Sequence, residues 1–154
     1  MNVAIIGASG YSGAELASLV AKHPNLTLSG CYVSEGSLDK HKLLSDLYPE
    51  HRNLLDIPLL PLSESAFDDI NSSADYICLC TDHKVSVDLA PQFLAMGKKV
   101  FDLSGGYRLA SNDDYVTYYG FEHQHPELLN EAAYGLAEWN SSAIANAKLV
   151  AVAG

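Results

Sequence analysis

Basic residues are scarce in this chain of 154 residues, which has nine lysines and arginines against nineteen aspartates and glutamates and a formal net charge of −10. Proteins bind a nucleic acid backbone through a basic face, so the charge balance argues against a nucleic acid partner. It does not exclude a small anionic ligand, because backbone N–H groups supply positive potential locally. We therefore expect a small-molecule partner.

Long apolar runs and a basic leader segment are also lacking. No run approaches the roughly 20 residues of a membrane span, and a strand-like pattern begins at Asn2. The three cysteines, an odd number, fit a reducing compartment. Cys31, Cys78 and Cys80 all lie in apolar strand-like runs, so we expect small buried hydrophobes rather than a metal site. These absences predict a cytoplasmic protein without membrane contact.

Short apolar segments alternate with helical patterns. The predicted strands are residues 2–6, 26–34, 57–62, 74–81, 98–104 and 147–154. The predicted helices are residues 11–23, 37–47 (a short helix or helical loop) and 85–97. This alternation predicts one α/β domain over residues 1–154, with a doubly wound, mostly parallel sheet of the Rossmann type. The irregular stretch 104–140 is expected as an insertion at the carboxyl edge of the sheet, where such folds bind ligands.

The segment GASGYSG, Gly7 to Gly13, joins the first predicted strand to the first helix. In this G-x-x-G-x-x-G spacing, Gly7 allows a sharp turn, Gly10 allows the backbone to approach a pyrophosphate, and Gly13 lets helix and strand pack closely. N–H groups at the helix start would then face the phosphates. The alternative is a tight turn that binds nothing, but the position at the first strand–helix junction favours a dinucleotide site.

The end of the second predicted strand bears on the identity of the dinucleotide. NAD sites usually have an acidic residue there to bond the ribose hydroxyls. Here Ser34 holds that position and Glu35 follows. Ser34 with Lys40 or Lys42 would suit the 2′-phosphate of NADP, although lysines are more often solvated surface residues. The pattern favours NADP, and Glu35 leaves NAD open.

Polar residues follow the fourth and fifth predicted strands. Thr81 and His83 are expected on the cofactor side. For His83 two roles are open: it either donates a proton to or contacts a ligand, or it caps or packs against the next helix. Ser104 and Gly105 can offer a hydroxyl and an N–H group to a ligand. Arg108, one of two arginines, suits a carboxylate or phosphate, or else an internal salt bridge.

No catalytic centre is evident from the residues alone. His123 and His125 form an H-x-H pair, but no third ligand is evident, so we expect structural histidines and no metal. No cysteine follows a strand at the carboxyl edge, and no Ser–His–Asp order appears. These residues predict a cofactor-binding domain without its catalytic partner.

Seven segments carry a resemblance to a known family: GASGYSGAEL, SDLYP, LAPQFL, FDLSGGYRL, YYGF, HPELL and AYGLAEW. In this order they resemble the N-terminal part of the N-acetyl-γ-glutamyl-phosphate reductases, enzymes of arginine biosynthesis, over nearly the whole chain. The resemblance implies attack of a cysteine thiolate on the acyl phosphate, loss of phosphate, and reduction of the thioester by NADPH to N-acetyl-glutamate 5-semialdehyde.

The resemblance also implies roles for individual residues. The pyrophosphate would be held by Gly7, Ser9, Gly10, Tyr11, Ser12 and Gly13. Ser34 would meet the 2′-phosphate, with Lys42 as a second candidate, while Thr81 and Ser104 would line the nicotinamide side. Arg108 would face the substrate, N-acetyl-glutamyl phosphate. The family often has an acid where this sequence has Gly106.

The last predicted strand, LVAVAG, leads in that family into the catalytic cysteine. The resemblance places this cysteine directly after Gly154, with Ala153 where proline is usual. We therefore expect residues 1–154 to bind NADP but reduce nothing, and the full-length enzyme to be a homo-oligomer with a further substrate domain. Without a following helix, we also expect Leu149, Val150 and Val152 to lose cover and to promote self-association.

Two other classes of protein remain open. Aspartate-semialdehyde dehydrogenases share the chemistry and the fold class, but their glycine loop usually lacks a tyrosine such as Tyr11. A non-enzymatic dinucleotide sensor would keep the glycine loop but would not need a strand that leads to a catalytic cysteine.

Overall fold

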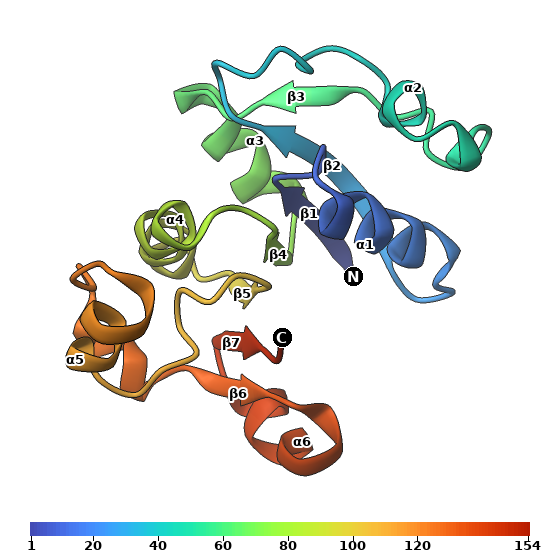
Figure 1. Ribbon diagram of the computed structural model, residues 1–154. Coiled ribbons are helices and arrows are strands. Elements are labelled where there is room, and N and C mark those ends of the chain that lie inside the picture. The colour runs from blue at the N-terminus through green and yellow to red at the C-terminus, as the bar shows by residue number, and fades with distance from the viewer. The chain divides into compact units, whose positions relative to one another are not determined.

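All 154 residues are described by the structure, a computed structural model. The chain divides into two compact units, the first Met1–Cys80 and the second Thr81–Gly154. Each has its own group of parallel strands with helices packed against them. Figure 1 shows the course of the chain through both.

The first unit contains four strands in the order β3-β2-β1-β4, and each neighbouring pair is parallel. The strands are β1 (Asn2–Ile6), β2 (Thr27–Val33), β3 (Leu59–Pro61) and β4 (Tyr76–Leu79). The helices are α1 (Tyr11–Lys22), α2 (Leu44–Leu47), the short 3-10 helix η1 (Pro49–His51) and α3 (Glu64–Ser73). Helix α1 packs on β1 and β2, and α3 packs on β2 (Figure 1).

The strand order places a topological switch point at β1. The chain runs outward from β1 through β2 to β3 and then returns to β4 on the other side of β1. Ligands of open α/β sheets bind outside the carboxyl ends of the strands at such a point. Because β1 is buried from Val3 to Ile6 and α1 packs small residues such as Ala14 and Ala17 inward, the loop between them is held firmly.

The second unit contains three strands in the order β5-β7-β6, again all parallel. The strands are β5 (Lys99–Asp102), β6 (Ala133–Gly135) and β7 (Leu149–Val152). Helix α4 (His83–Ala95) packs on β5, and α6 (Ala137–Asn146) packs on β6. The segment between β5 and β6 forms three short helical pieces, α5 (Asn112–Asp114), η2 (Tyr115–Tyr119) and η3 (Pro126–Asn130).

The α/β class and the parallel strands are confirmed, and all six predicted strands are present. The sequence did not predict α3, β6 and α6, nor the short helical pieces η1, α5, η2 and η3. Within the predicted helix 37–47, only α2 is helical. The irregular stretch 104–140 therefore contributes a strand as well as loops.

The expected loss of cover along β7 is wrong for two of its three residues. Leu149 and Val150 are buried, and Val152 is half-buried. The physical reason is the unpredicted β6, which makes β7 an inner strand paired with β5 on one edge and β6 on the other. None of the helices is both long and apolar enough to span a bilayer.

This burial predicts that β7 contributes strongly to stability. Replacing Leu149, which is 1% exposed, with alanine should lower the free energy of unfolding by about 2–5 kcal/mol. The matched control is Leu38→Ala at a side chain that is 91% exposed, where we expect a change within about 0.5 kcal/mol. Urea unfolding followed by circular dichroism measures both, and equal effects would contradict the inner position of β7.

Candidate functional site

The glycine loop turns the chain sharply off β1. Gly7 has φ of +84°, a left-handed conformation that side chains other than glycine rarely adopt. Its N–H group donates to the carbonyl of Tyr32 at 2.9 Å, and the N–H of Ala8 donates to the same oxygen at 3.1 Å. These two bonds hold the loop against the carboxyl end of β2.

Gly13 and Gly10 are glycines for different reasons. A Cβ atom at Gly13 would lie 2.7 Å from the Cα atom of Ala8 and would also meet the carbonyl oxygen of Gly7, so only glycine lets α1 approach this closely. Gly10 has an ordinary φ of −78°, and a Cβ there would meet only the Gly7 oxygen, at 3.5 Å. The fold thus requires glycine at position 13 but not at position 10. The open space beside Gly10 fits the close approach of a ligand.

The start of α1 has free donors. Its N-cap residue, Gly10, makes no side-chain capping bond, and the first N–H groups of a helix lack acceptors within the helix. Tyr11 and Ser12 are exposed at this positive end of the helix. The carbonyl of Ser9 accepts a hydrogen bond from the hydroxyl of Tyr48 at 2.9 Å. The six predicted loop residues therefore surround a helix N-terminus that suits an anion.

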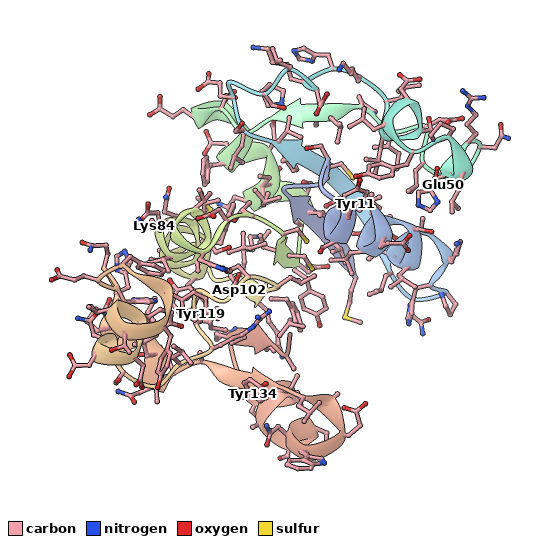
Figure 2. All side chains as sticks on the ribbon, viewed as in Figure 1. Tyr11, Glu50, Lys84, Asp102, Tyr119 and Tyr134 are labelled. Atoms are coloured by element: carbon pink, nitrogen blue, oxygen red, sulfur yellow. The ribbon has the colours of Figure 1, made fainter.

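A pocket of about 450 Å³ adjoins the loop. It is lined by Tyr11, Ala14, Glu15, Leu47, Tyr48 and Glu50. The ring of Tyr11, 85% exposed, meets the ring of Tyr48 edge-on, with 6.1 Å between the centroids. Figure 2 labels Tyr11 on α1 and Glu50 beyond α2. Sequence reasoning gave Tyr48 no role, because its partner Ser9 lies 39 residues away; the segment SDLYP was its only signal.

Ser34 lies just beyond β2 and is exposed. Its carbonyl accepts from the N–H of Ser37 at 2.9 Å, so it begins a tight turn. The two predicted lysines have partners. Lys42 forms an ion pair with Asp39 at 2.8 Å, and the ammonium of Lys40 donates to the carbonyl of Glu35 at 3.2 Å. The exposed hydroxyl of Ser34 is therefore easier for a ligand to reach than the charge of Lys42.

In the second unit, a buried carboxylate organises the turn after β5. Asp102 accepts from the N–H of Ser104 at 3.0 Å and from its hydroxyl at 2.9 Å. The N–H of Gly106 then donates to the Ser104 oxygen at 2.9 Å. Ser104 thus uses both its donors on Asp102, and the hydroxyl that we expected to face a ligand is already bonded internally.

The imidazole of His83 accepts a hydrogen bond from Gly105. The N–H of Gly105 donates to Nδ1 at 2.8 Å, and the ring of Tyr119 packs edge-on against His83 at 4.9 Å. The expectation that His83 caps α4 is wrong, because Asp82 is the N-cap and accepts from the N–H of Lys84 at 3.1 Å. The helix begins two residues earlier than the predicted 85–97, which puts His83 in its first turn. The contact with Tyr119 fits a packing role, and a role of His83 toward a ligand stays a prediction.

Arg108 joins the ends of two strands. Its Nε donates to the carbonyl of Val152 and one of its terminal nitrogens to that of Leu103, both at 2.8 Å. The alternative of an internal salt bridge is wrong, since two backbone carbonyls take the place of an acid. The guanidinium also lies directly beside Gly154, where a Cβ atom would meet its central carbon at 2.7 Å. Thr81 shares a hydrogen bond of 2.8 Å with the hydroxyl of Ser86.

One histidine and two cysteines are buried, which indicates structural roles. His123 is buried, with Nε2 bonded to the carbonyl of Gly106 at 2.7 Å and Nδ1 accepting from the N–H of His125 at 3.1 Å. Burial lowers the pKa of His123, so the neutral ring is favoured. Burial also raises the pKa of Cys31 and of Cys78 to about 12, which keeps both thiols protonated and poor nucleophiles.

The comparison with protein families identifies the class of domain. Residues 2–147 match the family described as semialdehyde dehydrogenase, NAD binding domain. The chain belongs to this family. Membership of the semialdehyde dehydrogenase NAD-binding family indicates a nicotinamide dinucleotide as the cofactor class.

The chain is also similar in sequence to individual proteins of known enzyme type. The N-acetyl-γ-glutamyl-phosphate reductase of Idiomarina loihiensis is 58% identical over 153 residues, which is 99% of this chain and 45% of that protein. That of Aeromonas salmonicida is 55% identical over the whole chain and 46% of its own length. The chain thus spans less than half the length of these relatives.

A solved structure shares the fold. Aspartate semialdehyde dehydrogenase II from Vibrio cholerae, complexed with ASA, gives a TM-score of 0.63 at 20% identity and covers 99% of this chain and 41% of its own. At this identity the likeness supports the Rossmann-type fold and nothing finer.

The two glycines of the loop should respond differently to alanine. Gly13→Ala should lower the free energy of unfolding by about 1–3 kcal/mol, because the added carbon meets fixed backbone. Gly10→Ala should leave stability within about 0.5 kcal/mol but weaken dinucleotide binding on the order of tenfold. Thermal unfolding and calorimetric titration of the same samples separate the effects. Full dinucleotide affinity in a folded Gly10→Ala variant would contradict a ligand beside Gly10.

Proposed function

We propose that the chain is the NADP-binding part of an N-acetyl-γ-glutamyl-phosphate reductase. The identity of 58% to the Idiomarina loihiensis reductase over nearly the whole chain carries this proposal. The glycine loop adds to it, because the space beside Gly10 and the uncapped start of α1 suit a pyrophosphate. Aspartate-semialdehyde dehydrogenase is the weaker candidate, since its support is a structural likeness at 20% identity.

The chain's own residues have three tasks in this proposal. The loop from Gly7 to Gly13 holds the pyrophosphate with backbone N–H groups, and Ser34 meets the 2′-phosphate. The residues proposed to contact the nicotinamide are Thr81, His83, Ser104 and Gly105. Ser104 has a shaping role, because its N–H and hydroxyl donors are bonded to Asp102. His83 accepts at Nδ1 from Gly105, which leaves its Nε2–H as the donor for a ligand. The dinucleotide, when bound, supplies the hydride.

Arg108 is proposed to face the acyl phosphate. A guanidinium is a strong partner for phosphate and carboxylate groups. Two carbonyls fix the Arg108 side chain beside Gly154, the residue after which we propose that the nucleophilic cysteine follows. This placement would set a positive charge next to the attacked carbonyl and the departing phosphate. The reading frame beyond Gly154 tests it directly, and a continuation without cysteine would contradict it.

The choice of NADP over NAD should depend on Ser34. Ser34→Asp places a carboxylate where it repels a 2′-phosphate and bonds the ribose hydroxyls, so NADP affinity should fall by about tenfold or more and NAD should bind more tightly than NADP. Ser72→Asp, at an exposed serine of α3, is the control for the added charge. Calorimetric titration with both dinucleotides measures the order. A preference of the unmodified chain for NAD would contradict the assignment and implicate Glu35.

Residues 1–154 should bind NADPH without turnover. Cys31 and Cys78 are buried with raised pKa values, so neither provides a thiolate for acyl transfer. The assay is the phosphate-dependent oxidation of N-acetyl-glutamate 5-semialdehyde with NADP, compared with a sample without protein. The full reading frame is the positive control and should prefer this substrate to aspartate semialdehyde. Turnover by residues 1–154 alone would contradict the proposed division of tasks.

A further inference from the structure

The proposed function gives no role to Tyr48 of the first unit, although its hydroxyl contacts the glycine loop. It lies between α2 and η1, and its N–H donates to the carbonyl of Leu44 at 3.1 Å. Helix α2 is itself anchored, because Leu44 is fully buried and its N–H donates to the carbonyl of Ile57 at 2.9 Å. The Tyr48 side chain therefore extends from a well-fixed segment.

The hydroxyl of Tyr48 reaches into the glycine loop. It donates to the carbonyl of Ser9 at 2.9 Å, while the N–H of the next residue, Gly10, donates to the carbonyl of Gly7 at 3.2 Å. The C=O of Ser9 and the N–H of Gly10 belong to one peptide plane, so both polar groups of that plane are fixed. The free N–H groups of α1 begin at the following residue, Tyr11.

From these contacts we propose that Tyr48 is a positioning residue that orients the Ser9–Gly10 peptide, and with it the N–H donors at the start of α1, for the pyrophosphate of the dinucleotide. This inference rests on the proposed function. Gly10 provides no side chain that could stiffen the helix start, so an orienting bond has to come from elsewhere in the chain. Tyr48 supplies it across 39 residues.

A direct contact between Tyr48 and the pyrophosphate fits the geometry less well. The hydroxyl is already used on the Ser9 carbonyl. The pocket on the ring's side is also lined by Glu15 and Glu50, whose carboxylates would repel a phosphate. Tyr48 thus acts through the loop backbone, and the ring contact with Tyr11 helps to hold it there.

The test removes one hydroxyl and keeps the ring. Tyr48→Phe should weaken NADPH binding by about 3- to 10-fold, the range expected for one lost hydrogen bond. Adenosine 2′-phosphate lacks the pyrophosphate, so its affinity should stay within about twofold, on the same reasoning. Tyr118→Phe, at a side chain that is 76% exposed in the second unit, is the matched control and should change neither.

Each outcome of this test has a distinct meaning. Unchanged NADPH affinity in Tyr48→Phe overturns the inference, and so does an equal loss for both ligands, which would indicate a general loosening of the first unit. Faster hydrogen exchange at the Gly10 N–H in the ligand-free variant supports the inference independently, and unchanged exchange contradicts it. An unmodified chain that binds adenosine 2′-phosphate and NADPH equally weakly would contradict the proposed function itself.

Discussion

The first unit depends on one close contact, the approach of the first turn of α1 to the backbone of the glycine loop. Gly13 rests against Ala8 and the Gly7 carbonyl at distances that a Cβ atom would not permit. The left-handed turn at Gly7 brings the chain into this position and ties it to β2. Because the helix starts so close to the strand end, its free N–H groups point out over the carboxyl edge of β1.

A different constraint holds the second unit together. Asp102 is fully buried, and no cation lies among its hydrogen-bond partners, which are the N–H and hydroxyl of Ser104. A buried carboxylate is tolerated only when hydrogen bonds satisfy it. The bonds continue from Ser104 to Gly106 and from the Gly106 carbonyl to His123. The turn after β5 is thereby rigid, which in turn fixes the Gly105 N–H on His83.

The features that the sequence predicted well are those set by neighbouring residues. The strands follow from short apolar runs, and the glycine loop from spacing within seven residues. Helix α3 was missed because its run of serines, aspartates and asparagine resembles a loop and buries only Ala66 and Ile70. The N-cap of α4 was assigned to His83 instead of Asp82, because the sequence pattern does not distinguish between two adjacent polar residues. The contact of Tyr48 with Ser9 depends on the path of the chain between them, which no local pattern contains.

The chemistry of a phenol explains why a tyrosine suits the contact with Ser9. A lysine or arginine would also donate to the Ser9 carbonyl, but it would add a charge beside a site whose potential comes from backbone N–H groups. A histidine would change its protonation near neutral pH and with it the geometry of the loop. Burial, with smaller contributions from Tyr11, Glu50 and Asp39, raises the pKa of Tyr48. Its hydroxyl therefore remains a neutral donor to the Ser9 carbonyl throughout the physiological range.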